Sequence, residues 1–210
     1  MANFHTHLTV AALGSMAATA ICIQKIGLSD AQAVTLFFLG MVAGLLPDID
    51  SDDSIPARWI FRSVNALVVF AVGWVSYERF PHLQWILMVA TTWGVMHWVI
   101  IRAFKAFTNH RGLIHSVPAA GLVGITIFHL GVQLAAWPTP FAWLAAAFAT
   151  GGYLLHLALD ELFSVDLLGR SLKQSFGTAM TLVVWRSWRA YLTLYALLGV
   201  ATLYAFERVS

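Results

Sequence analysis

Long apolar segments separated by proline, glycine and polar residues are the feature that most constrains the fold of this 210-residue chain. Each segment approaches the roughly 17–25 residues that an α-helix needs to cross the hydrocarbon core of a bilayer. Backbone polar groups in lipid must be satisfied internally, so these segments are expected to be helical. We expect helices over residues 6–24, 30–46, 57–77, 82–105, 113–136, 141–163 and 188–206. Residues 176–187 also fit an interfacial helix, so the sequence predicts about six to seven spans.

The scarcity of charged side chains supports the same fold class. Only 10% of the residues are charged and 60% are hydrophobic, whereas soluble domains carry about 25% charged residues. We therefore predict an all-α, polytopic transmembrane helix bundle, with residues 1–210 forming a single integral-membrane domain. No Lys or Arg precedes the first apolar run, which favours a retained first helix over a cleaved signal peptide. The net charge of +2 gives no reason to expect a nucleic-acid partner.

The basic residues are distributed unevenly between the two sides that this topology creates. The side with the N-terminus and the connections after the second, fourth and sixth helices carries Arg58, Arg62, Arg102, Lys105, Arg111, Arg170, Lys173, Arg186 and Arg189. The other side carries only Lys25, Arg79 and Arg208. Because cytoplasmic loops are enriched in Lys and Arg, the first side is predicted to face the cytoplasm.

Residues of metal-binding type gather on the predicted cytoplasmic side. They are His7, Asp48, Asp50, His110, His115, His156 and Asp160. His156 and Asp160 are four residues apart, which places both side chains on one face of a helix. An ionisable pair in an otherwise apolar helix is costly unless it meets a partner. The seven residues therefore predict a metal site at the cytoplasmic face.

The mixture of imidazoles and carboxylates indicates the metal and its chemistry. Such ligands suit Zn²⁺, with Mn²⁺ or Fe²⁺ as alternatives. Four histidines and three aspartates exceed the needs of one tetrahedral ion, so we expect two or more ions sharing a carboxylate, which can activate water and neutralise an anionic substrate oxygen. Arg111 follows a predicted ligand, and its guanidinium can clamp a phosphate or a carboxylate. Lys173 is a second candidate for contacting the substrate.

Each of these motifs also has a structural interpretation when it is taken alone. His156 and Asp160 can form a buried hydrogen-bonded pair between helices. Asp48 and Asp50 can be solvated carboxylates after a helix that ends at Pro47. The segment from His110 to His115 fits an interfacial turn, and its Arg111 can anchor a helix end beside anionic lipid.

Four motifs together resemble a known family. Thr6-His7 opens the first helix, and Gly44-Leu-Leu-Pro47-Asp48-Ile-Asp50, His110-Arg111-Gly112-Leu-Ile-His115-Ser116 and Gly152-Tyr153-Leu-Leu-His156-Leu-Ala-Leu-Asp160 follow. This combination is similar to that of the membrane-bound metal-dependent hydrolases, also described as LexA-binding inner-membrane hydrolases. The resemblance implies a hydrolase whose motif residues bind metal, and it implies no particular substrate. Many members have a histidine soon after the second aspartate, where this chain has Ser51-Asp52-Asp53.

Three functions are compatible with these features. The first is hydrolysis of a phosphoester, on a lipid, a lipid-linked substrate or a small molecule, with the seven ligands holding metal and Arg111 stabilising developing charge. The second is divalent-metal transport, although transporter ligands tend to lie near the bilayer midplane. The third is a membrane-anchored partner of a regulatory protein, as the LexA-binding description suggests. The position of the predicted ligands at helix ends favours the hydrolase.

Overall fold

The computed structural model describes residues 3–50, 55–100, 113–166, 171–172 and 180–207. The chain forms two compact units. Unit 1 comprises residues 1–47 and 111–210, and unit 2 comprises residues 48–110. Each unit is described by itself, and the single domain expected over residues 1–210 stays a prediction.

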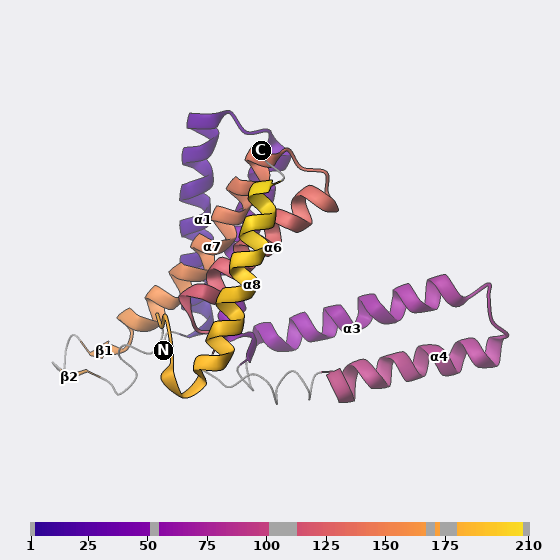
Figure 1. Cartoon of the computed structure of the whole chain (residues 1–210). Coiled ribbons are helices and arrows are strands. Elements are labelled where there is room, and N and C mark those ends of the chain that lie inside the picture. Colours follow the sequence, from indigo (N-terminus) through magenta and orange to yellow (C-terminus); the bar gives the residue numbers. More distant parts are fainter. Residues whose placement is uncertain (1–2, 51–54, 101–112, 167–170, 173–179, 208–210) are drawn as a thin grey trace. The chain divides into compact units, whose positions relative to one another are not determined.

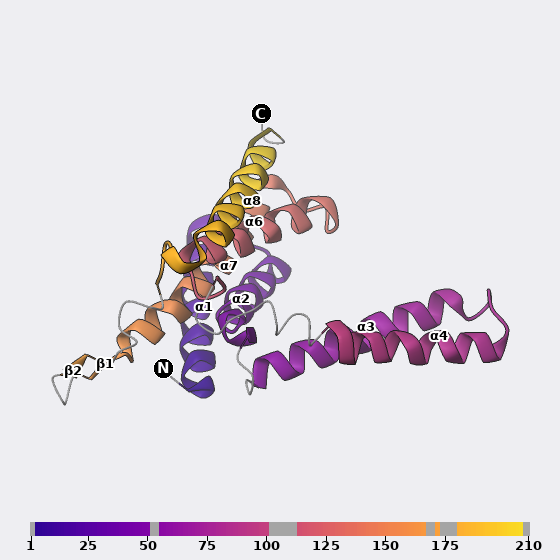
Figure 2. The same ribbon diagram turned by 60° about the horizontal axis from the view of Figure 1, so that its bottom comes forward.

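The described residues of unit 1 form a bundle of five α-helices. They are α1 (Phe4–Ile26), α2 (Asp30–Ala43), α6 (Val117–Gln133), α7 (Thr139–Leu162) and α8 (Trp188–Glu207). Helix α7 packs against α1, α2 and α6, and α8 also packs against α6 (Figures 1 and 2). The remaining elements are short: the antiparallel strands β1 (Val165–Asp166) and β2 (Ser171–Leu172), and a 3-10 turn, Trp185–Ser187, before α8.

Local sequence signals explain where the helices of unit 1 begin. The Asn3 side chain accepts a hydrogen bond from the backbone of Thr6 and caps α1. Ser29 and Gln32 form a reciprocal capping box at the start of α2. Ser116 caps α6, and Pro118 lies in the first turn of that helix, where its missing N–H has no cost.

Two glycines allow α2 and α7 to approach closely. A methyl group placed on Gly152 would lie 2.1 Å from the carbonyl oxygen of Gly40. A methyl group on Gly44 would lie 2.6 Å from the Cβ atom of Ala11, so α1 also comes close here. Small residues are enriched where membrane helices touch, because association there depends on close packing. This contact fixes the position of the end of α2 relative to the second half of α7.

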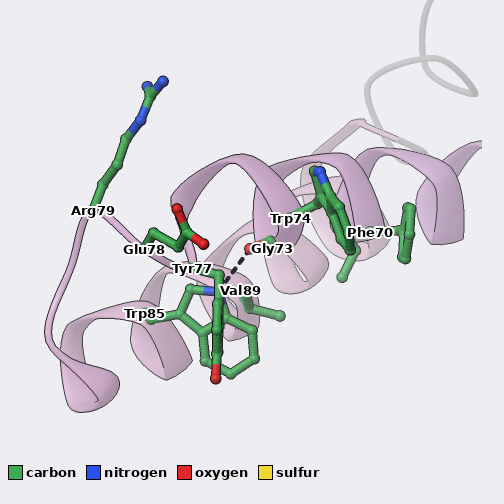
Figure 3. Close-up of a pocket in the computed structure, with 9 residues that line it drawn as sticks. Phe70, Gly73, Trp74, Tyr77, Glu78, Arg79, Trp85 and Val89 are labelled. Carbon is green, nitrogen blue, oxygen red and sulfur yellow. Dashed lines mark hydrogen bonds between the residues drawn. The ribbon is translucent and has the colours of Figure 1, made fainter.

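Unit 2 is built around a helical hairpin. Helix α3 (Ile55–Ser76) and helix α4 (His82–Gly94) pack along each other, and α4 continues into a π-helical segment, Val95–Ile100. The indole of Trp85 donates a hydrogen bond of 2.8 Å to the carbonyl oxygen of Gly73, which ties α4 to α3 (Figure 3). Apolar and aromatic side chains cover much of the hairpin surface, and no α4 residue is buried among those that the structure describes.

The structure confirms an all-α fold that suits a membrane bundle. The seven α-helices of the described residues correspond to the seven expected segments. Within the described ranges, four helical segments are long and apolar enough to cross a membrane: Phe4–Ile26, Asp30–Asp48, Thr139–Leu162 and Trp185–Glu207. Helix α6 is apolar but shorter. Several boundaries differ from the prediction, and two of these differences lie next to predicted site residues. Helix α6 begins at Val117 rather than 113, and α2 ends at Ala43 before a 3-10 helix, Leu46–Asp50, that contains Pro47.

Candidate metal centre

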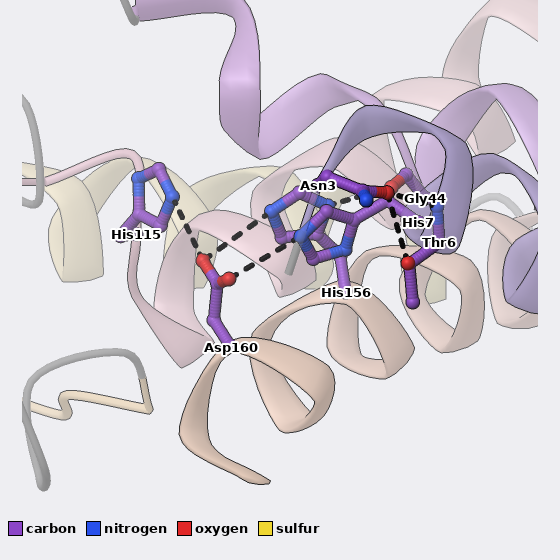
Figure 4. Close-up of polar contacts among 7 residues, drawn as sticks. All are labelled: Asn3, Thr6, His7, Gly44, His115, His156 and Asp160. Atoms are coloured by element: carbon purple, nitrogen blue, oxygen red, sulfur yellow. Dashed lines mark hydrogen bonds and ion pairs between the residues drawn. The ribbon is translucent and has the colours of Figure 1, made fainter. Parts of the chain in front are cut away.

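Four polar side chains are buried together near one end of unit 1 (Figure 4). His7, His115, His156 and Asp160 have exposed fractions of 1%, 0%, 1% and 3%. His7 lies in the first turn of α1, and His115 lies just before α6. His156 and Asp160 lie in the last two turns of α7. Three segments that are far apart in the sequence therefore contribute to one buried polar cluster.

The carboxylate of Asp160 is the centre of this cluster. Its Oδ1 atom lies 3.3 Å from Nε2 of His7. Its Oδ2 atom lies 3.7 Å from Nε2 of His156 and 3.8 Å from Nε2 of His115. The rings of His7 and His156 are stacked, with centroids 3.8 Å apart. The two carboxylate oxygens thus face different histidines.

A hydrogen bond to α2 orients the imidazole of His156. The Nδ1 atom lies 2.8 Å from the carbonyl oxygen of Gly44. A carbonyl oxygen can only accept, so Nδ1 carries the proton and donates it. In the neutral form of this ring, Nε2 carries the lone pair that can bind a metal ion, and it lies 3.7 Å from Oδ2 of Asp160. Metal-binding histidines commonly use such a backbone contact to fix their tautomer.

The buried face of α1 consists of His7 and a row of small residues, which allows this helix to pack closely in the bundle. His7, Ala11, Ser15 and Thr19 are spaced four apart and form the buried face of α1. The Ser15 hydroxyl donates a hydrogen bond of 2.8 Å to the carbonyl oxygen of Phe37 on α2. The cap at the helix start places His7 within the first two turns, so its imidazole reaches the end of the bundle.

The loop that carries His115 is held from two sides. The Tyr153 hydroxyl donates a hydrogen bond of 2.6 Å to the carbonyl oxygen of Ile114. The Thr181 hydroxyl donates one of 3.0 Å to the carbonyl oxygen of His115. The Thr181 hydroxyl also lies 3.1 Å from that of Tyr191, which is buried at the start of α8. Helices α7 and α8 together therefore position the backbone of His115.

The geometry of the cluster fits a divalent metal ion. One ligand atom from each of His7, His156 and Asp160 lies within 4.8 Å of the other two. A tetrahedral zinc site with bonds of about 2.0–2.1 Å has ligands about 3.4 Å apart, close to the distances from Asp160. Among the described residues, both carboxylate oxygens and Nδ1 of His7 are buried without a hydrogen-bond partner. A buried carboxylate beside three imidazoles is expensive unless a cation or further hydrogen bonds satisfy it.

The other predicted site residues belong to unit 2 or lie outside the described residues. Asp48 is half-buried in the 3-10 helix Leu46–Asp50 and is the first residue of unit 2. Asp50 ends that helix, and its side chain lies outside the described part of the structure. His110, Arg111 and Lys173 also lie outside the described residues. Their roles stay predictions.

Sequence reasoning did not assign roles to the residues that position the cluster. The carbonyl of Gly44, the hydroxyls of Tyr153 and Thr181, and the close contact at Gly152 belong to this group. A partial signal exists for the glycines, because Gly40 and Gly44 form a small-x-x-x-small pattern in an apolar helix. No comparable signal exists for Thr181, since its partner is 66 residues away along the chain.

Comparison with known proteins identifies a family for the whole chain. No curated protein and no solved structure matches the sequence. A family model described as YdjM inner membrane protein matches residues 1–207. This match agrees with the apolar helices of both the sequence and the structure, and it supports an inner-membrane location. The chain belongs to the YdjM inner membrane protein family.

Proposed function

We propose that the protein is a membrane-embedded, metal-dependent hydrolase that cleaves a phosphoester. The observation that supports this most is the meeting of His7, His156 and Asp160, whose ligand atoms lie within 4.8 Å of one another in a buried position. His115 adds a third imidazole on the Oδ2 side of the carboxylate. Two oxygens facing different histidines suit an aspartate that bridges two ions.

The position of the cluster supports a lipid or lipid-linked substrate. His7 lies at the start of α1, His115 precedes α6, and Asp160 lies in the last turn of α7. Helix ends lie near the headgroup region when a helix crosses a bilayer. A phosphoester in a lipid headgroup would therefore lie at the depth of the ligands. Transporter sites tend to lie near the midplane, which makes metal transport the weaker alternative.

In this proposal, different residues bind the metal, orient a ligand and bind the phosphoryl group. His7, His115, His156 and Asp160 hold divalent metal, preferably Zn²⁺ with Mn²⁺ or Fe²⁺ as alternatives, and Asp48, Asp50 and His110 are further predicted ligands. A bound ion of this kind polarises a phosphoryl oxygen and makes water a better nucleophile. The Gly44 carbonyl keeps the His156 ring in the ligand tautomer. Arg111 is predicted to clamp the phosphoryl group and stabilise its charge, with Lys173 as a second contact.

The same proposal places the cluster at the cytoplasmic face. The hydrogen bonds of Thr181 bring the start of α8 close to His115, and Arg186 and Arg189 lie at that start. Lys25 lies in the last turn of α1, at the opposite end from His7. A reporter that is active only in the periplasm, fused after residue 210, tests this orientation. Activity is expected, since α8 would begin in the cytoplasm, and an inactive reporter would contradict the orientation.

The decisive experiment combines metal analysis with turnover. The full chain, purified in detergent, is analysed for bound metal and assayed on generic phosphoesters and on membrane lipid extracts. His7→Ala is expected to lose metal and turnover together. His5→Ala is the matched control, because His5 is an exposed imidazole two residues away.

Three outcomes would count against the hydrolase. If the purified protein bound stoichiometric metal but hydrolysed no phosphoester, the proposed phosphoester hydrolysis would be contradicted. Metal uptake into liposomes that Asp160→Ala abolishes would favour a transporter instead. Capture of a regulatory protein by a variant that lacks all four cluster side chains would favour the partner-protein alternative.

A further inference from the structure

Unit 2 contains a cavity that the metal centre does not use. It has a volume of about 830 Å³ and lies along the α3–α4 hairpin (Figure 3). Its walls include Phe70, Trp74, Tyr77 and Trp85. Glu78 and Arg79, in the turn that joins α3 to α4, also line it. The cavity is therefore aromatic along the helices and charged at the turn.

The aromatic wall is ordered by contacts within the hairpin. The Trp85 ring meets Tyr77 edge to face, with centroids 5.5 Å apart, and its N–H is bound to the carbonyl oxygen of Gly73. The rings of Phe70 and Trp74, which precede Tyr77 on α3, are stacked on each other. Trp74 nevertheless has an exposed fraction of 76%, so most of its indole surface is available to an apolar ligand.

The two charged residues have opposite signs and adjoin each other in sequence. Neither Glu78 nor Arg79 forms an ion pair with another of the described residues, and both are exposed. Figure 3 shows the Arg79 side chain extending away from the helices, with Glu78 between it and the aromatic rings. One end of the cavity thus offers a cation and an anion, while the remainder offers apolar and aromatic surface.

We propose that this cavity binds one membrane glycerophospholipid with a phosphoethanolamine headgroup. The guanidinium of Arg79 contacts the phosphate, and the carboxylate of Glu78 accepts hydrogen bonds from the ammonium group. The acyl chains lie along Phe70, Trp74 and Val89. The phosphate and the ammonium group of this lipid complement the two charges at the turn. Its apolar acyl chains match the aromatic remainder of the cavity. A soluble dipolar ion would leave the aromatic wall uncovered, and an anionic lipid would leave Glu78 unmatched.

Native mass spectrometry of the delipidated full chain tests the proposal. The probes are dioleoyl phosphatidylethanolamine, dioleoyl phosphatidylglycerol and an N-acetylated phosphatidylethanolamine that lacks the ammonium charge. The wild-type protein is expected to bind one ethanolamine lipid about threefold to fivefold more tightly than either of the others, as exposed ion pairs contribute modestly. Equal binding of all three lipids would overturn the proposal, and this result requires no variant.

Substitutions then assign the headgroup contacts. Glu78→Gln is expected to abolish the preference for ethanolamine, while Arg79→Gln weakens all three lipids by about threefold. Lys25→Gln and Asp30→Asn are matched controls, because each removes an exposed charge from the end of a helix in unit 1. An unchanged ethanolamine preference in Glu78→Gln, or the same loss in the controls, would refute the site. So would a wild-type dimer that binds no lipid, since a second copy would then cover the aromatic surface.

Discussion

The second half of α7 and the α3–α4 hairpin are both apolar helical structure, yet they treat polar groups in opposite ways. Ten residues of α7 are buried, and they include His156 and Asp160. The hairpin keeps Glu78 and Arg79 exposed in its turn and has exposed aromatic residues along its helices. Burial makes the α7 groups depend on partners from other segments, whereas solvent or lipid headgroups can satisfy the hairpin charges. The comparison teaches that, among these four ionisable residues, those that helices enclose have specific side-chain partners, whereas the two exposed ones form no ion pair with another described residue.

The largest effect is expected from Asp160→Asn. This change preserves the size of the side chain but removes the charge that faces three histidines. Metal affinity, measured by competition with a chelator, is expected to fall by more than about 100-fold, beyond the 10–100-fold typical of residues outside the first ligand layer. Asp30→Asn, an exposed carboxylate at the start of α2, is expected to leave metal affinity unchanged. Equal affinity in both variants would mean that the enclosed cluster is not a metal site.

Gly152→Ala tests whether the close contact of α2 and α7 supports the cluster. The added methyl group would meet the Gly40 carbonyl, so α2 must shift and the Gly44 carbonyl moves with it. We expect the free energy of unfolding to fall by about 1–3 kcal/mol and the metal content to decrease. Gly151→Ala is the control, since a methyl group there meets no atom within 4 Å. Thermal unfolding in detergent and metal analysis measure both effects, and identical behaviour of the two variants would contradict the packing argument.

A smaller effect is expected from Tyr153→Phe. The change removes only the hydroxyl that holds the carbonyl of Ile114 and thereby the backbone next to His115. We expect a loss of about 0.5–1.5 kcal/mol of stability and roughly a tenfold loss of metal affinity. Tyr195→Phe removes a hydrogen bond of a similar kind, to Leu182, at an exposed position. If both variants lose the same metal affinity, the role of Tyr153 in positioning His115 is wrong.

The smallest effect on the metal centre is expected from a change in the hairpin. Trp85→Phe removes the hydrogen bond to Gly73 while it keeps an aromatic ring. The expected cost is about 0.5–1.5 kcal/mol of stability, with metal affinity unchanged. Both quantities are measured as for the α7 variants. A drop in metal affinity as large as that of Tyr153→Phe would show that the two regions are not independent.

The sequence predicts the helices and much of the cluster for simple physical reasons. Apolar length and breakers locate the seven helices of the described residues, and the spacing of His156 and Asp160 places them on one face of α7. His7 and His115, which the sequence groups with them, lie 3.3 and 3.8 Å from the carboxylate of Asp160, and their role as metal ligands stays a prediction. These features depend on periodicity and on the side of the membrane at which each helix begins or ends, both of which can be read along the chain.

Other features depend on contacts that local sequence does not encode. The start of α6 at Val117 follows from the Ser116 cap and from the pairing of Ser116 with Thr181, which a hydrophobic pattern cannot reveal. The π-helical segment Val95–Ile100 changes the helical repeat inside a continuous apolar run. The tautomer of His156 depends on a carbonyl 112 residues away. Long-range backbone contacts therefore limit what could be predicted.

One face of α7 carries Tyr153, His156 and Asp160 within about two turns, and each touches a different segment of unit 1. Insertion or deletion of one residue in the middle of α7 would turn that face by about 100° relative to the first half of the helix. All three contacts would then be lost at once, even though the helix would stay apolar and long enough to cross a membrane. Substitutions on the exposed side of α7, by contrast, would not change the direction in which this face points.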